Sequence, residues 1–239
     1  MRLDQAIAAR FAEVSRRKAR DLIAAGRVLV NERVVSVASR EVKESDRIVL
    51  AEALPEIAVI RETPEWVAVD KPPGVPAQPA RDRAVLSLEE MLRVKYRDIW
   101  LVHRLDTPAS GVVLFARTRD AAAKFSRLFA TGEMRKIYLA RVAGSIEEER
   151  TIETPIGGKP ALTIVTPRGG DVIEVEIRTG RTHQIRIHLA SIGHPVAGDR
   201  RYGGPPAPRL MLHAWRLEHP SIGTLEAPVP EPFAIRSAP

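Results

Sequence analysis

The stretch of sequence that decides the fold of most of this chain is residues 101–115, which read LVHRLDTPASGVVLF. Two apolar runs flank a polar insertion that contains His103, Arg104 and Asp106. Asp-Thr-Pro and Ser-Gly are common turn pairs, so a turn before a strand explains the insertion without any function. A serine-hydrolase site is not indicated, because the sequence has no Gly-x-Ser-x-Gly turn to carry the nucleophile.

A second informative stretch is GRTHQIRIHL at residues 180–189. Its apolar spacing predicts a helix over residues 182–192. Arg181 precedes this helix and is free to point into a cleft. His183 and His188 are five residues apart, whereas two histidines that face one metal on a helix are four apart. We therefore predict no metal site here.

A third stretch, RKIYLARVAG at residues 135–144, alternates in the manner of a strand. Tyr138 projects from the same face of this strand as Lys136, and a buried structural tyrosine also fits the alternation. The remaining strands and helices follow no regular strand–helix–strand order, which predicts an α+β domain. Further strands are expected near 66–70, 112–116, 172–177 and 210–217, with helices near 86–94 and 121–130.

The first 50 residues predict a small separate unit. One short helix runs to Phe11, and a second begins after Ser15 and ends at Gly26. Apolar runs at 28–30 and 33–35 predict a hairpin, and a third strand follows at 47–50. The first turn of the second helix carries three cationic side chains, at the end where the helix dipole is positive. Such a cluster either binds phosphates or is a solvated basic face, and its members are Arg16, Arg17 and Lys18.

Composition limits the classes of function. The chain has 239 residues, 44% of them hydrophobic, with no cysteine, which excludes disulfide scaffolds, thiol nucleophiles and thiolate metal sites. With 37 Lys and Arg against 30 Asp and Glu, its formal charge of +7 favours a polyanionic partner. Because no apolar run approaches the length of a membrane span and no secretion signal is recognisable, we expect a cytoplasmic protein without membrane contact.

Together these motifs resemble the RluA family of RNA pseudouridine synthases, from about residue 57 to the end of the chain. The first 50 residues resemble an S-four-type RNA-binding domain. The resemblance implies an α+β pseudouridine synthase fold, with a mixed, largely antiparallel sheet and a central cleft, preceded by a small α/β RNA-binding domain. The domains are expected at residues 1–52 and 61–239, with a linker at 53–60.

The resemblance also implies roles for individual residues. Asp106 is the expected catalytic carboxylate, and we expect Arg181 to bind it and keep it charged. Tyr138 is expected to stack on the uracil, and Arg104 to fill the space that the extruded base leaves. No cofactor is expected, because no phosphate-binding glycine loop is present. Three further residues of the matching motifs are expected to contact the substrate, namely His103, Lys71 and Leu212.

The predicted function is isomerisation of specific uridines in structured RNA, with large-subunit ribosomal RNA favoured and transfer RNA as the alternative. A catalytically silent RNA-binding or ribosome-assembly protein is a second interpretation. Hydrolysis of a nucleosidic bond by Asp106 and another carboxylate is a third. The motif departs from the family where Thr107, Pro108 and Ala109 follow the aspartate. We expect a monomer.

Overall fold

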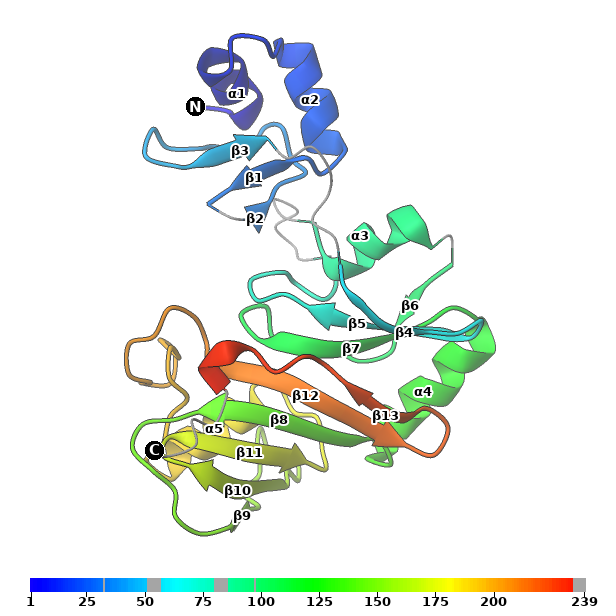
Figure 1. Ribbon diagram of the computed structural model, residues 1–239, viewed down its shortest axis with the longest axis vertical. Coiled ribbons are helices and arrows are strands. Elements are labelled where there is room, and N and C mark those ends of the chain that lie inside the picture. The colour runs from blue at the N-terminus through cyan, green and yellow to red at the C-terminus, as the bar shows by residue number, and fades with distance from the viewer. Residues whose placement is uncertain (32, 51–56, 80–85, 97, 234–239) are drawn as a thin grey trace. The chain divides into compact units, whose positions relative to one another are not determined.

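The computed structural model describes residues 1–31, 33–50, 57–79, 86–96 and 98–233 (Figure 1). Contacts divide the chain into two compact units, which consist of residues 1–57 with 74–97 and of residues 58–73 with 98–239. Half of the expected linker at 53–60, residues 53–56, lies outside the described residues, and its last two residues, 59 and 60, belong to a strand. These two units group residues 74–97 with the N-terminal part of the chain, whereas the sequence predicts that they belong to the domain at 61–239.

The N-terminal unit has two helices and a three-stranded antiparallel sheet of order β2-β1-β3. Helix α2 begins where expected, because the Ser15 hydroxyl accepts a hydrogen bond from the Lys18 N–H at 3.2 Å. Helix α2 ends at Ala24, and Gly26 just beyond it has φ +68°, a left-handed conformation typical of the residue that follows a helix. The elements are α1 (Leu3–Arg10), α2 (Arg16–Ala24), β1 (Val28–Val30), β2 (Arg33–Val34) and β3 (Ile48–Leu50).

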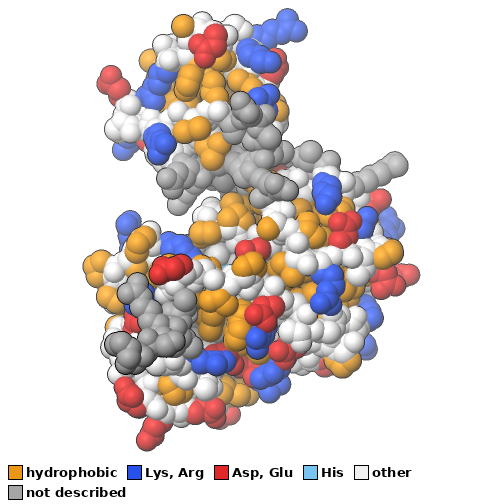
Figure 2. Space-filling view, viewed as in Figure 1, with side chains coloured by type: hydrophobic (Ala, Val, Ile, Leu, Met, Phe, Trp, Pro, Cys, Tyr) orange, Lys and Arg blue, Asp and Glu red, His pale blue; other side chains and the backbone are white. Residues whose placement is uncertain are grey.

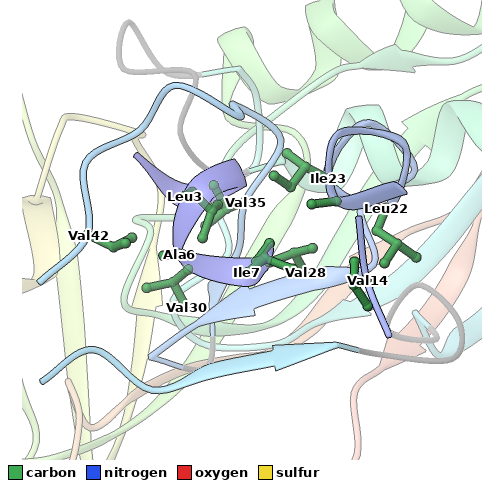
Figure 3. Close-up of a cluster of buried hydrophobic side chains, with 11 residues drawn as sticks. Leu3, Ala6, Ile7, Val14, Leu22, Ile23, Val28, Val30, Val35 and Val42 are labelled. Carbon is green, nitrogen blue, oxygen red and sulfur yellow. The ribbon is translucent and has the colours of Figure 1, made fainter. Parts of the chain in front are cut away.

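Apolar side chains from both helices and from the strands meet in the core of this unit (Figure 3). Leu3 and Ile7 come from α1, Ile23 from α2, and Val28 from β1, and each is at most 1% exposed. The same unit includes α3 (Leu88–Lys95), which begins at a capping box. A small core of this kind holds the exposed basic start of α2 in a fixed position.

The larger unit is built on a ten-stranded sheet, as counted in the described part of the chain. Its main path is β4-β5-β7-β12-β8-β11-β10-β9, with β13 beside β12 and β6 beside β7. The strands are β4 (Val59–Glu62), β5 (Trp66–Lys71), β6 (Trp100–Leu101), β7 (Ser110–Ala116), β8 (Arg135–Arg141), β9 (Arg150–Ile152), β10 (Thr163–Gly169), β11 (Val172–Ile177), β12 (Leu212–His219) and β13 (Gly223–Glu226).

One parallel pairing, between β7 and β12, joins the two halves of this sheet, while the other pairings within it are antiparallel. At this junction Gly111 (φ +114°) lies opposite Ala214, and a Cβ at Gly111 would be 2.1 Å from the Ala214 carbonyl oxygen. Glycine is therefore required for the strands to approach. The expected α+β class and the mixed, largely antiparallel sheet are confirmed.

Two helices of the larger unit position its cavity. Helix α4 (Arg119–Thr131) is capped by the Thr118 hydroxyl and ends at Gly132, whose position beside the Arg178 carbonyl leaves no room for a side chain. Helix α5 (Gln184–Ser191) lies behind β8 and β11 in Figure 1. It starts two residues later than predicted.

A short 3-10 helix, η1 (Glu231–Phe233), follows the last strand. No helix among the described residues is long and apolar enough to cross a membrane.

Candidate active site

A cavity of about 370 Å³ opens in the larger unit between the loop after β6, helix α4, strand β8 and the start of α5. This volume lies within the range of small-molecule pockets. Among its described lining residues four are Arg or Lys and one is acidic, so the cavity favours a ligand with negative charge. Those five residues are Arg104, Lys136, Arg181, Arg186 and Asp106.

Asp106 lies at this cavity with a side chain that is 24% exposed. Its Oδ2 accepts a hydrogen bond from Nη1 of Arg186 at 3.0 Å. The same oxygen lies 3.8 Å from Nε2 of His183, whose pKa is lowered by burial and by the nearby Arg186 and Arg201 cations, against the effect of Asp106. A neighbouring guanidinium favours the charged form of a carboxylate.

A second carboxylate fixes Arg186. Asp199 is buried, and its two oxygens accept hydrogen bonds from Nε and Nη2 of Arg186 at 2.6 and 2.8 Å. Although burial raises the pKa of Asp199, the hydrogen bonds from Arg186 and from two backbone N–H groups lower it overall. Tyr202 covers the guanidinium, with its ring centroid 5.1 Å from Cζ. Arg186 is thus held rigidly while one nitrogen remains for Asp106.

The expected ion pair between Arg181 and Asp106 is not the one that forms. Nε of Arg181 donates to the Pro160 carbonyl at 3.0 Å, and Arg181 lines the outer part of the cavity. Arg186, which lies inside both the predicted and the observed helix, takes the expected contact because Asp199 holds its guanidinium with one nitrogen left for Asp106. A charge in an apolar helix needs a partner, and this signal could have identified Arg186 from the sequence.

The start of α5 is held in an unusual conformation. His183, the residue before the helix, has φ +57°, a left-handed backbone that costs of order 1–3 kcal/mol for a residue other than glycine. Gln184 stabilises this turn, because its amide bonds the hydroxyls of Thr179 and Thr163 at 2.7 and 3.0 Å. Its Oε1 also accepts from the backbone N–H of Arg181 at 3.1 Å. The turn thereby directs Arg186 toward Asp106.

Lys71 is placed differently from the expected substrate contact. It is fully buried outside the cavity lining, and its Nζ donates to the carbonyls of Pro72 and Thr107 at 3.0 and 3.1 Å. Burial lowers the pKa of Lys71 to about 7, while the charge of Asp106 acts to raise it. Since Thr107 follows Asp106 directly, Lys71 supports the loop that carries the carboxylate.

The other expected residues do line the cavity. His103 stacks on Phe129 with ring centroids 4.1 Å apart, and its Nε2 accepts from the Leu114 N–H at 2.9 Å. Burial, and then the Lys136 cation, lower the pKa of His103 to about 3, so its ring is neutral. Arg104 is exposed at the mouth.

Tyr138 and Leu212 are buried and supply the apolar wall of the cavity. They come from neighbouring strands, since β8 and β12 are paired. Burial, and then the negative charge of Asp106, raise the pKa of Tyr138 above its usual value. The phenol is therefore neutral at physiological pH, and its ring offers a flat apolar surface.

In the N-terminal unit, three arginines converge on one buried carboxylate that the sequence analysis missed. Asp4 accepts hydrogen bonds from Nε of Arg2, Arg16 and Arg20 at 3.2, 3.1 and 3.0 Å. Burial raises the pKa of Asp4, but hydrogen bonds from Arg20 and Arg16 and the charges of Arg16 and Arg2 lower it to about 2. About half of each arginine side chain stays exposed, so the cluster can also meet a phosphate.

The sheet face opposite the cavity is neutralised by ion pairs. Arg135 donates to Glu176 and to Glu218 at 2.8 Å each, and Arg168 pairs with Glu174. On the face drawn in Figure 2, Lys and Arg side chains of the larger unit are interspersed with Asp and Glu. The basic excess of the chain therefore does not form one patch on that face.

Comparison with known proteins identifies the family. The family model described as RNA pseudouridylate synthase matches residues 65–191, and the S4 domain model matches residues 1–48. The chain is 34% identical over 245 residues to an uncharacterized RNA pseudouridine synthase of Helicobacter pylori J99, which covers 93% of this chain and 95% of that protein.

Two further proteins of known sequence or structure support the same family. The ribosomal large subunit pseudouridine synthase D of Nitrosomonas europaea is 32% identical over 232 residues, which cover 80% of this chain and 67% of that protein. The solved structure of human RNA pseudouridylate synthase domain containing 1 superposes with a TM-score of 0.63 at 28% identity, over 75% of this chain and 85% of that one. The chain therefore belongs to the RNA pseudouridylate synthase family and is an RNA pseudouridine synthase, an isomerase, with an S4 domain at its N-terminus.

Proposed function

We propose that this enzyme converts uridine to pseudouridine in large-subunit ribosomal RNA and that Asp106 is its catalytic carboxylate. The observation that carries the assignment is the hydrogen bond from Arg186 to Asp106 at a cavity of about 370 Å³. A carboxylate is thereby held in a fixed position in a site that also offers an apolar ring surface.

The isomerisation needs such a carboxylate near the sugar. The bond between uracil N1 and ribose C1′ breaks, and a bond between C5 and C1′ forms. The C5 proton is lost, and N1 gains a proton, so the reaction balances without a second substrate. Asp106 serves either as the nucleophile at C1′ or as the base that removes the neighbouring sugar proton, and both roles require its charged form.

The cavity accepts one nucleotide rather than a stacked helix, so the target must leave the stack at a cost of a few kcal/mol. Tyr138 and Leu212 receive the base on the wall of the cavity, and Arg104 at its mouth takes the place of the base in the RNA. Phosphate contacts offset the extrusion cost.

The S4 domain supplies further phosphate contacts. Arg17 and Lys18 are exposed at the amino end of α2, and Arg16 is held beside them by Asp4. The backbone N–H groups at this end add to the attraction for phosphate. Ribosomal RNA is favoured as the substrate because the relative from Nitrosomonas europaea carries that substrate in its name.

The test is complementation of cells that lack this protein. Carbodiimide-based mapping of total RNA is expected to show pseudouridine missing from large-subunit ribosomal RNA. Wild type and the surface control Asp120→Asn are expected to restore it, whereas Asp106→Asn is not. Purified Asp106→Asn should bind the RNA within about threefold of wild type, since it removes a charge that the transition state needs.

Each other outcome would contradict part of the proposal. If cells that lack this protein lose pseudouridine from transfer RNA alone, the substrate is transfer RNA and not ribosomal RNA. Restoration by Asp106→Asn would remove the catalytic role and favour an RNA-binding or assembly protein. Release of free uracil from the RNA would indicate hydrolysis of the nucleosidic bond instead of isomerisation.

A further inference from the structure

Lys136 is a buried cation that pairs with no described residue. It lies on β8 two residues before Tyr138, so both side chains project from the same face of the strand. It lines the cavity and is only 5% exposed. In the ranges that the structure describes, its ammonium has no hydrogen-bond or ion-pair partner. Its neighbour Arg135, on the opposite face, is paired with two glutamates.

An ammonium in this position costs folding free energy. An unpaired buried charge is unfavourable, and a methionine would fill the same space without that cost. Burial, and then the Arg178 cation, lower the pKa of Lys136 to about 8, so it remains largely charged at neutral pH. A charge that is kept in the cavity without a protein partner is available to a ligand.

The position of Lys136 in the cavity indicates which part of a bound nucleotide its ammonium contacts. The Asp106 charge raises the pKa of Tyr138, whereas the charge that acts on Lys136 is that of Arg178. Tyr138 and Lys136 line the cavity from the same face of β8, two residues apart, whereas Asp106 reaches it from the loop after β6. With the sugar at Asp106 and the base on Tyr138, Lys136 is the cation next to the base on the same strand face.

We propose that Lys136 is a catalytic residue that donates a hydrogen bond to a carbonyl oxygen of uracil and stabilises the negative charge which this oxygen gains when the glycosidic bond breaks. The inference rests on the proposed function. When the bond between N1 and C1′ breaks, its electron pair stays on the uracil and is shared with O2 and O4. Lys136 keeps its proton throughout, so the balance of the isomerisation is unchanged.

The first test compares Lys136→Met with Lys124→Met, a control on the exposed surface of α4. Using RNA that contains the mapped uridine, Lys136→Met is expected to lower kcat by about 100-fold and to leave the Kd for RNA within about threefold. Lys136→Arg, which keeps the charge, is expected to stay within about tenfold of wild type. Lys124→Met should resemble wild type.

A second test identifies the oxygen. RNA fragments carrying 4-thiouridine or 2-thiouridine at the target replace one carbonyl oxygen by sulfur, a weaker acceptor. One of the two is expected to slow wild type at least about tenfold more than Lys136→Met, because the variant has already lost that contact. Equal slowing of both enzymes by both fragments would overturn the proposal.

The outcomes separate this proposal from the proposed function. If wild type makes pseudouridine but Lys136→Met keeps kcat within about threefold, Lys136 has no catalytic role. A weaker Kd with unchanged kcat would make it a phosphate contact and also overturn the proposal. If wild type forms no pseudouridine in ribosomal RNA, the proposed function itself fails. Should Lys136→Met not fold, Lys136→Gln replaces it in both tests with the same expected result.

Discussion

Asp199 binds Arg186 with both carboxylate oxygens, at 2.6 and 2.8 Å, and thereby fixes the guanidinium that reaches Asp106. The three residues come from separate parts of the larger unit, since Arg186 lies in α5 and the two aspartates lie in loops. Because Asp199 is 1% exposed, water does not compete for this contact. The candidate active site therefore depends on a carboxylate that does not line the cavity.

Asp199→Asn is expected to impair both stability and turnover. The asparagine keeps the size of the side chain but leaves the buried guanidinium with one carboxylate fewer, and breaking a buried ion pair costs about 3–5 kcal/mol. Urea unfolding is the measure of stability. At a temperature where the variant is folded, kcat should fall more than the affinity for RNA. A variant as active as wild type would show that Asp106 alone orients Arg186.

Arg186→Lys and Arg181→Lys form a matched pair. A lysine at 186 is a single point donor that cannot hold both aspartates, so kcat is expected to fall by about 100-fold or more. Arg181 contacts the Pro160 carbonyl instead, and its substitution is expected to cost less than about tenfold. Single-turnover rates on the mapped RNA provide the measurement. The reverse order of the two effects would restore the pairing expected from the sequence.

Lys71→Met tests the support beneath the catalytic loop. The pKa of Lys71 is about 7 in the folded protein and about 10.5 in an unfolded chain. Between these values the unfolded chain holds a proton that the folded chain lacks, so the free energy of unfolding should rise with pH. Urea titrations at about pH 7 and about pH 9 should show a smaller rise for Lys71→Met than for wild type.

Activity gives the second measure for this variant. Loss of the hydrogen bond to the Thr107 carbonyl should lower kcat by about tenfold, because the Asp106 loop is no longer held in place. A Lys71→Met enzyme that shows the same pH dependence of stability as wild type would contradict the lowered pKa. Full activity would contradict the supporting role.

The salt dependence of binding tests the S4 domain. Arg17 and Lys18 are exposed at the start of α2, and their joint substitution by glutamine should weaken RNA binding. The slope of log K against log salt should decrease in magnitude by about 2, one for each phosphate contact. Arg150→Gln with Lys159→Gln removes the same charge from exposed positions of the larger unit and serves as the control. Equal slopes for the two double variants would refute a specific contact by α2.

The sequence alone determined the elements and the family, because these depend on local patterns. Ser15 and Gly26 mark the ends of α2, the alternation within residues 135–144 marks β8, and the pattern of residues 101–115 marks the loop that carries Asp106. Each signal lies within one short stretch of chain. The family resemblance that these motifs carry pointed to Asp106, Tyr138, Leu212 and Arg104, and the structure brings all four to one cavity.

Only the tertiary structure decided the partners of the charged residues. Arg186 rather than Arg181 binds Asp106, because Asp199, 13 residues further on, returns to α5 and holds the Arg186 guanidinium, whereas Arg181 donates to the Pro160 carbonyl. Lys71 supports a loop 36 residues away. The energy of a buried charge depends on which groups surround it in space, and the linear sequence carries no direct record of those distances.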